Sequence, residues 1–431
     1  MIQRANTDGW DINNVPIIEL RGSSYEIGHA HGLQLHEQIH AQLVIYEDIF
    51  QKKCKFTWEQ VRDAARQYQP AIEKLAPHLH DEMRGIVDGV NDTGNGSGDA
   101  LGDAWHLTHG ISGRHIDILD VIALNARSEI ALGQFDDGCT ALAWDVDRLV
   151  DVEAGTESRS RQHRRILAQN WDWRTAVGPN LVLASIKQEG KPDIWMVIEP
   201  GIVGKIGFNS ASLGVCLNAI RAKPVDKNLL PVHVILRLLL EQTCLTDALE
   251  LISTLGGCAS SQHILIASPC GSRSLELSPL GTVYITEDSM GLVVHTNHFL
   301  ENHLVEEPPW LSGSPIRLER AKELCAGLVK EYGRDKIREE LCPTVLRQRV
   351  FADTLNSPQA ICCVPDPCRD ESIETLFNIV MIFEEGKVPY AEVAFGRPAT
   401  TDAKYTRRLS SSSYGTSLSA IEIPLQYDTS T

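Results

Sequence analysis

Apolar residues recur at two different periods along the chain, and the period changes near residue 139. From Ile27 to Phe50 they return at every third or fourth position, which predicts one face of a long helix. The preceding stretch SSYE, residues 23–26, has capping-box spacing and predicts where that helix begins. Helical patterns follow over 58–75, 78–90 and 115–130, so residues 1 to about 135 are predicted to be mostly helical.

From Cys139 onward, short apolar runs separated by turns predict strands. The runs are CTALAWDV, ILAQNWDW, NLVLASIK, DIWMVIEP, the Gly-broken hairpin GKIGFNSASLGVCLNAI, HILIAS, SLELSP, TVYITE, GLVVHTNHF, TLFNIVMIF and PYAEVAF. Helices are predicted between them at 231–242, 245–255, 315–332 and 343–355. The Ser/Thr-rich residues 398–431 are predicted to be a loose tail. This order of elements predicts an α+β fold with sheets packed between helical layers.

Charge and composition narrow the class of protein. The 431 residues carry a formal net charge of −17, which argues against a nucleic-acid or anionic-membrane partner. The polar N-terminus lacks an apolar signal core, so no secretory signal is predicted. The sequence has no run of eighteen apolar residues, so no membrane span is predicted. Eleven cysteines without a secretion signal suggest free thiols, so we expect a cytoplasmic protein.

Two histidine-rich stretches raise the question of a metal. HEQIH, residues 36–40, matches H-E-x-x-H on a predicted helix, so a zinc hydrolase with Glu37 as general base is one alternative, the other being a solvated helix face. HTNHFLENH, residues 295–303, lacks Cys or Asp ligands at structural-zinc spacing, and no metal is predicted there. Its Asn297 is either a turn residue or an amide directed at a developing oxyanion.

Cys139 stands at the point where the pattern changes, directly after the turn DDG. A thiol nucleophile needs a base, and no histidine is near it in sequence. If the Gly138–Cys139 bond is cut, the new α-amine of Cys139, with an ordinary pKa of about 8, can take the thiol proton. A small residue before the cut, a strand after it and a carboxylate near the amine would be required. Asp172, in QNWDW, is a candidate for that carboxylate.

These residues also carry a family resemblance. DDGCTALAW, LAQNWDW, EPGIVGKIGFNSASLGVCLNAI, LELSP, HTNHFL and ETLFNIV, together with PIIELRGSSYEIGHAHG, resemble successive motifs of the acyl-coenzyme A:6-aminopenicillanate acyltransferase (isopenicillin N acyltransferase) family. The likeness spans residues 15–397 in order. It implies the four-layer αββα fold of the N-terminal-nucleophile (Ntn) hydrolases. It also implies autocatalytic cleavage into an α chain, 1–138, and a catalytic β chain, 139–431, which stay together as a heterodimer.

The resemblance also assigns site residues. Cys139 matches the family nucleophile, Asp172 the carboxylate near its amine, and Asn297 the donor to the oxyanion. Ser278, in LELSP, matches a serine whose role does not follow from the residues. Ala141 replaces a threonine of the penicillin enzyme, and Glu371 with Ser372 replaces its Ser-Arg pair, for which Arg369 is the nearest arginine.

The resulting prediction is an N-terminal-cysteine acyltransferase. It would move an acyl group from acyl-coenzyme A or an amide, through a thioester on Cys139, to the amine of a small amino-acid-like or peptide-like acceptor, in secondary metabolism. No resident cofactor is expected, and acyl-coenzyme A would be a co-substrate. The alternatives are an amidohydrolase of acyl-amide or β-lactam type with the same nucleophile, and a catalytically silent scaffold.

Overall fold

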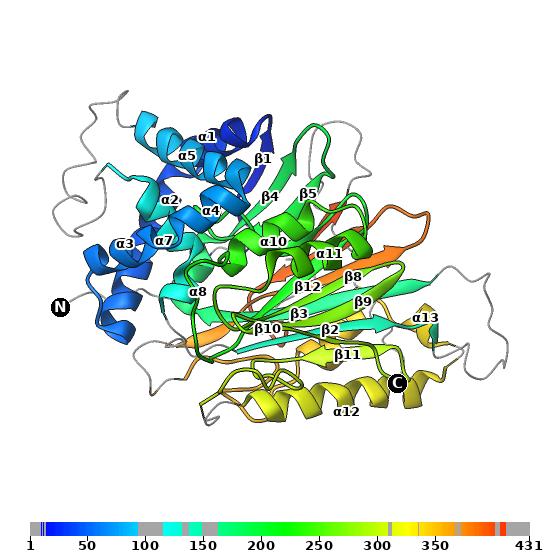
Figure 1. Ribbon diagram of the computed structural model, residues 1–431. Coiled ribbons are helices and arrows are strands. Elements are labelled where there is room, and N and C mark those ends of the chain that lie inside the picture. The colour runs from blue at the N-terminus through cyan, green and yellow to red at the C-terminus, as the bar shows by residue number, and fades with distance from the viewer. Residues whose placement is uncertain are drawn as a thin grey trace.

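Two facing sheets form the centre of the molecule in the computed structural model (Figure 1). The structure describes residues 10, 12, 14–93, 115–131, 138–148, 163–308, 313–334, 336–366, 368, 372–400 and 406–410. Within them, one sheet has eight strands in the order β1-β4-β5-β6-β7-β8-β9-β10, and the other has six in the order β11-β2-β3-β12-β13-β14. Strands β2 and β3 of the second sheet pack directly on β7 and β8 of the first.

The eight-stranded sheet is antiparallel except at its first pair, where β1 runs parallel to β4. Its strands are β1 (Ile17–Arg21), β4 (Val182–Lys187), β5 (Ile194–Ile198), β6 (Ile206–Asn209), β7 (Gly214–Ala219), β8 (Gln262–Ser268), β9 (Gly271–Ser278) and β10 (Gly281–Ile285). The six-stranded sheet is antiparallel throughout its described strands. Its strands are β11 (Leu292–His295), β2 (Gly138–Asp145), β3 (Arg164–Arg174), β12 (Ile373–Glu384), β13 (Tyr390–Phe395) and β14 (Thr406–Ser410).

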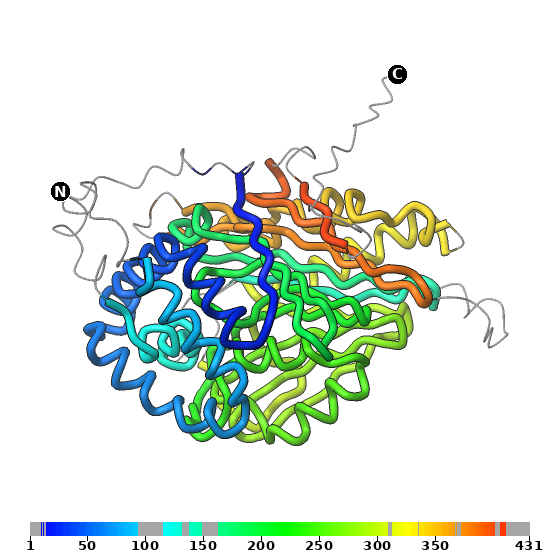
Figure 2. Tube along the Cα trace, turned by 90° about the horizontal axis from the view of Figure 1, so that it is seen from above, coloured from blue at the N-terminus to red at the C-terminus, as the bar shows by residue number. Residues whose placement is uncertain are grey.

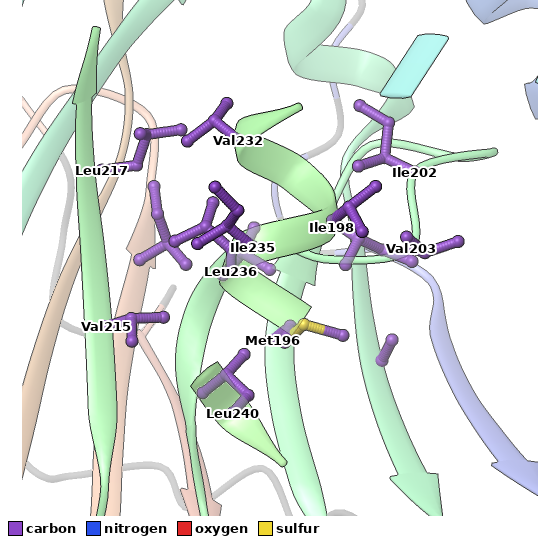
Figure 3. Packing of buried hydrophobic residues seen from close by; sticks show 14 of the residues in the cluster. Met196, Ile198, Ile202, Val203, Val215, Leu217, Val232, Ile235, Leu236 and Leu240 are labelled. Atoms are coloured by element: carbon purple, nitrogen blue, oxygen red, sulfur yellow. The ribbon is translucent and has the colours of Figure 1, made fainter. Parts of the chain in front are cut away.

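Helices cover the outer faces of both sheets, which makes four layers in the order αββα (Figure 1). Helices α10 (Val232–Leu240) and α11 (Leu245–Leu255) lie on the eight-stranded sheet, and α12 (Ser314–Tyr332) lies on β11 and β2 of the other. Figure 3 shows the apolar side of α10, with Val232, Ile235, Leu236 and Leu240 among buried strand residues. The predicted α+β class and its four-layer arrangement are therefore confirmed.

The N-terminal helices gather at one end of this sandwich (Figure 2). They are α1 (Ser24–Gln34), α2 (His36–Ile49), the π-helical turn η2 (Phe50–Cys54), α3 (Trp58–Arg66), α4 (Gln69–Leu75), α5 (Pro77–Asp92), α7 (Ile118–Asn125) and α8 (Arg127–Ile130). The remaining short elements are the 3₁₀-helix η4 (Thr175–Asn180), α13 (Ile337–Glu340), α14 (Pro343–Leu346) and η5 (Arg347–Phe351). No helix within the described residues combines the length and apolar character needed to cross a bilayer.

The predicted long helix over 27–50 is two helices, with a break at Leu35. The capping box at Ser23 is present as predicted. Leu35 has non-helical backbone angles, φ −119° and ψ 25°, and so separates α1 from α2. Helix α1 packs closely on α5, where a Cβ on Gly28 would lie 1.9 Å from the Glu82 carbonyl oxygen. Periodicity alone does not record such a turn.

Two edge strands also differ from the sequence-based expectation. The N-terminal segment predicted as mostly helical contributes β1 to the eight-stranded sheet. Within the tail predicted to be loose, Thr406–Ser410 forms β14 beside β13. Both are five-residue strands at the edges of their sheets, and each is too short for its pattern to distinguish a strand from the start of a helix or a loop.

Candidate active site

The β2–β3 pair places Cys139 beside Asp172. In the antiparallel register Cys139 lies opposite Trp171, and Gly138 lies opposite Asp172. Residues directly opposite in such a pair have their side chains on the same face of the sheet. The Cys139 side chain is 3% exposed and belongs to the core between the two sheets. The Gly138–Cys139 bond thus starts a buried strand.

The Asp172 carboxylate lies against this bond. Its Oδ1 accepts a hydrogen bond from the Thr375 hydroxyl of β12 at 2.6 Å, which orients the group. A Cβ placed on Gly138 would lie 3.0 Å from Asp172 Oδ2. The position before Cys139 is therefore adjacent to a buried carboxylate and leaves little space for a side chain.

Asn297 reaches the same residue from the loop after β11. Its side-chain Oδ1 accepts the backbone N–H of Cys139 at 2.7 Å, and its Nδ2 donates to the Ala219 carbonyl at 3.0 Å. The backbone N–H of Asn297 donates to Ser314 Oγ at 2.8 Å, which ties the loop to the start of α12. The structure therefore brings together Cys139, Asp172 and Asn297, which are far apart in the sequence.

Arg317 is a fourth member of this group that sequence reasoning missed. Its Nη2 donates to Asn297 Oδ1 at 2.8 Å, and its Nη1 donates to the Cys139 carbonyl and to Thr140 Oγ1. A signal was present, because Arg317 shares a helical face with the buried Ala321 and Cys325, four and eight residues later. An arginine on the apolar face of a helix indicates a buried partner.

The loop that carries Asn297 is held by a buried carboxylate. Glu276 accepts backbone N–H groups from Leu300, Glu301 and Asn302, and its Oε1 lies 2.8 Å from Nε2 of His295. Burial disfavours the charged form of Glu276, but these donors together lower its pKa. The ring of His263 stacks on that of His295 with centroids 3.5 Å apart. His295 thus supports the loop, and no metal set among the described residues includes a histidine of HTNHFLENH.

A second charged cluster lies beside Trp171, the residue opposite Cys139. Glu199 binds Lys205, Arg127 at 2.7 Å and the Tyr46 hydroxyl at 2.6 Å. All four side chains are buried. Burial disfavours the charged form of Glu199, yet the two cations hold its pKa below the ordinary value. The Lys205 ammonium lies 3.5 Å from the ring centroid of Trp171, the residue opposite Cys139.

The other sequence candidates lie apart from this group. The Ser278 hydroxyl donates to the Gly281 carbonyl and accepts from Leu280 N–H, both within its own hairpin. Arg369 and Glu371 lie outside the described residues. The two histidines of HEQIH, on α2, join no cluster of three metal-type ligands within the described ranges.

The one such cluster in the described part of the chain is Asp145, Asp147 and His163. Arg165 pairs with Asp145 at 2.8 Å, and Arg338 pairs with Asp147. These cations already balance the carboxylates, so the cluster is not assigned a metal.

Comparison with known proteins agrees with the motifs. Residues 159–342 match the model of the acyl-coenzyme A:6-aminopenicillanic acid acyl-transferase family, a range that starts after Cys139 and includes Asp172 and Asn297. The chain is 29% identical over 397 residues to the acyl-coenzyme A:6-aminopenicillanic-acid-acyltransferase 40 kDa form of Emericella nidulans, covering 91% of this chain and 96% of that one. These two matches confirm the resemblance that the motifs indicated.

Two solved structures share weaker likeness. Penicillin V acylase from Agrobacterium tumefaciens matches at 15% identity and a TM-score of 0.29, over 60% of this chain and 84% of its own. A single-residue variant of conjugated bile acid hydrolase from Clostridium perfringens matches at 10% identity and a TM-score of 0.32, over 66% of this chain and 92% of its own. TM-scores this low carry no weight, and the four layers rest on the sheets and helices themselves.

Proposed function

Because the chain is a relative of the acyl-coenzyme A:6-aminopenicillanic acid acyltransferases, we propose that it is a self-processing acyltransferase whose nucleophile is the thiol of Cys139. The observation that carries this proposal is the set of buried polar groups around the Gly138–Cys139 peptide bond. Asp172 lies against Gly138, and Asn297 together with Arg317 holds the backbone N–H and carbonyl of Cys139. Buried polar groups from three distant segments converge on the bond that would be cut.

Cleavage would convert the Cys139 amide nitrogen into an α-amine that remains next to Asn297 Oδ1 and the Asp172 carboxylate. A free amine has a lone pair and can accept the thiol proton, which an amide nitrogen cannot do. The thiolate then attacks the carbonyl carbon of the donor, the leaving group departs, and a thioester on Cys139 forms. An amine acceptor attacks this thioester and regenerates the thiol.

Asn297 has two functions in this scheme. Its Oδ1 holds the nitrogen of Cys139, and Arg317 donates to the same oxygen, so the orientation of the amide is determined. Its Nδ2 carries two hydrogens and uses one for the Ala219 carbonyl. We assign the second hydrogen to the oxyanion that forms on the donor carbonyl, an interaction worth about 3–4 kcal/mol of barrier.

The two fragments would remain associated after cleavage. Strand β1 of the N-terminal fragment pairs with β4 of the C-terminal fragment. Tyr46 and Arg127 of the first bind Glu199 of the second in the buried cluster. Loss of these contacts would leave buried charges unpaired, so a stable heterodimer of 1–138 and 139–431 is expected.

Mass spectrometry of the purified protein tests cleavage. Two fragments, the larger beginning at Cys139, are expected, and Cys139→Ala should give the intact chain only. Cys325→Ser is the matched control, since burial raises the pKa of the Cys325 thiol to about 12 and it should not affect cleavage. A wild-type chain that is active while uncut would contradict the proposal.

Incubation with an acyl-coenzyme A and a panel of amino-acid-like amines tests the acyl transfer. Amide product that requires Cys139 is expected, with the free acid as a side product. If free acid alone forms from every amine, or if only an amide donor is hydrolysed, the protein is an amidohydrolase with the same nucleophile. Acyl-coenzyme A is proposed here as a co-substrate.

A further inference from the structure

Lys205 is a buried amine whose position is set by two contacts, one with a carboxylate and one with an indole ring. It lies directly before β6, is 0% exposed, and binds Glu199. Its Nζ is 3.5 Å from the ring centroid of Trp171 on the facing sheet. A cation over an indole ring at this distance is held by the ring's electrostatic field. The ammonium therefore points from one sheet toward the other.

The same geometry places Lys205 on the face of β2 and β3 that carries the Cys139 thiol. Trp171 lies opposite Cys139, so both side chains are on the face of β2 and β3 that meets the other sheet. The charge of a Cys139 thiolate would act on both Lys205 and Cys216 of β7, and it would raise the pKa of each. Lys205, Trp171 and Cys139 thus form one group between the sheets.

The uncut chain lacks the base that the cut chain has. Before cleavage the nitrogen of Cys139 is an amide that donates its hydrogen to Asn297 Oδ1 at 2.7 Å. An amide nitrogen has no basic lone pair, so it cannot take the thiol proton in the first cleavage event. His233 is also engaged, since its Nδ1 donates to the Gly204 carbonyl and its Nε2 faces Arg127. Asp172 lies opposite Gly138, so its carboxylate is on the other face of the β2–β3 pair from the Cys139 thiol. Lys205 is on the thiol's own face, because it contacts Trp171, the residue opposite Cys139.

We propose that Lys205 is the proton acceptor, and that it transfers the Cys139 thiol proton to the departing nitrogen during self-cleavage. The inference rests on the proposed function, because it concerns the maturation of the same nucleophile. Neutral Lys205 takes the proton from Sγ, and the thiolate attacks the carbonyl carbon of Gly138. The C–N bond breaks, the protonated Lys205 gives its proton to the nitrogen of Cys139, and a Gly138 thioester remains. Water hydrolyses this thioester to a carboxylic acid and the free thiol.

The charged groups around Lys205 favour its taking up and returning a proton near neutral pH. Burial lowers the pKa of Lys205 to about 7, with Glu199 opposing the shift and Arg127 adding to it. The titratable or charged groups around it are Glu199, Arg127, Tyr46, His233 and Cys139. A group that is half protonated near neutral pH can both accept and return a proton.

Cell-free synthesis followed by a time course of cleavage tests the inference. Lys205→Arg, which stays charged at every accessible pH, and Lys205→Met should each slow cleavage by about 100-fold or more. Lys191→Met is the control, because Lys191 is a partly exposed lysine that pairs with Glu241 and not with Glu199. In the wild type, the rate should rise with pH and level off above about 7, whereas the variants should lose this inflection.

Chemical rescue separates a proton-transfer role from a structural one. Added methylamine or ethylamine should restore cleavage of Lys205→Ala in proportion to the amine concentration, and should not restore cleavage of Cys139→Ala. A folded Lys205→Arg chain that is cut at the wild-type rate overturns the inference, as does a wild-type rate that is flat from pH 6 to 8. The pH dependence of the wild-type cleavage rate tests the inference even if the variants fail to fold. A wild-type chain that is never cut contradicts the proposed function instead.

Discussion

His31 Nε2 accepts the backbone N–H of Gly201 at 3.0 Å, across the boundary between the two proposed fragments. His31 lies on α1, and Gly201 lies in the turn after β5. An imidazole nitrogen that accepts a hydrogen bond carries no proton, so this contact requires neutral His31. If the chain is cut as proposed, we expect the association of the two fragments to depend on pH.

We expect acid to weaken the fold through this residue. Burial, with a smaller contribution from the charge of Arg237, lowers the pKa of His31 from 6.5 to about 4. Between these values the unfolded chain binds the proton and the folded one does not, so the free energy of unfolding falls as pH decreases from 6.5 toward 4. By pH 4 the loss of unfolding free energy that comes from His31 approaches about 3 kcal/mol.

Urea unfolding of the uncut Cys139→Ala chain at pH 7 and pH 4.5 measures this effect. His31→Gln keeps an acceptor for Gly201 and should reduce the difference in unfolding free energy between the two pH values. His29→Gln, on the same helix but paired with Asp92 near the surface, should leave that difference unchanged. An equal pH dependence in all three chains would contradict the assignment.

Arg317→Met should slow both self-cleavage and turnover. The guanidinium orients Asn297 and holds the Cys139 carbonyl, and a buried hydrogen bond to a charged group is worth about 1.5–3 kcal/mol, or about 10- to 100-fold in rate. The kcat should fall while KM changes little. Arg320→Met, one turn along α12 and paired with Asp353, should retain wild-type kinetics.

Gly138→Val should slow cleavage by about 10-fold or more while the chain still folds. A Cβ at this position meets Asp172 Oδ2 at 3.0 Å, so a branched side chain must displace the carboxylate or the bond to be cut. The cleavage rate on a denaturing gel gives the comparison. Gly327→Ala, at a position with nothing within 4 Å of the added Cβ, serves as the control. Cleavage of Gly138→Val at the wild-type rate would show that cleavage does not depend on the close approach of Asp172 to position 138.

Glu276→Gln should lower both stability and activity. The ionised carboxylate accepts three backbone N–H groups of the loop after Asn297, and a neutral amide has only one acceptor oxygen. A loss of about 2–4 kcal/mol in unfolding free energy is expected, together with a reduced kcat. Glu306→Gln, on the exposed part of the following segment, should change neither quantity. Normal kcat in Glu276→Gln would mean that Asn297 needs no support from this loop.

Features that depend on residues close together in the sequence could be predicted from it. The capping box at Ser23 and the extent of α11, 245–255, depend on residues within a few positions of one another, and both occur where the sequence predicts them. The change from helical to strand periodicity at Cys139 likewise marks the start of β2. Edge strands β1 and β14 were not predicted as such, because their pairing depends on a neighbour far along the chain.

The sequence by itself determined the α+β class, the family motifs, and Cys139 and Asp172 as site candidates, because these depend on short-range spacing and residue type. The family resemblance added Asn297 as the donor to the oxyanion. Only the tertiary structure decided that the amide of Asn297 holds the backbone of Cys139, that Arg317 orients it, and that Lys205 lies over Trp171. Those contacts join residues from different layers of the fold. Their distances follow from how the two sheets and α12 pack, which no local pattern encodes.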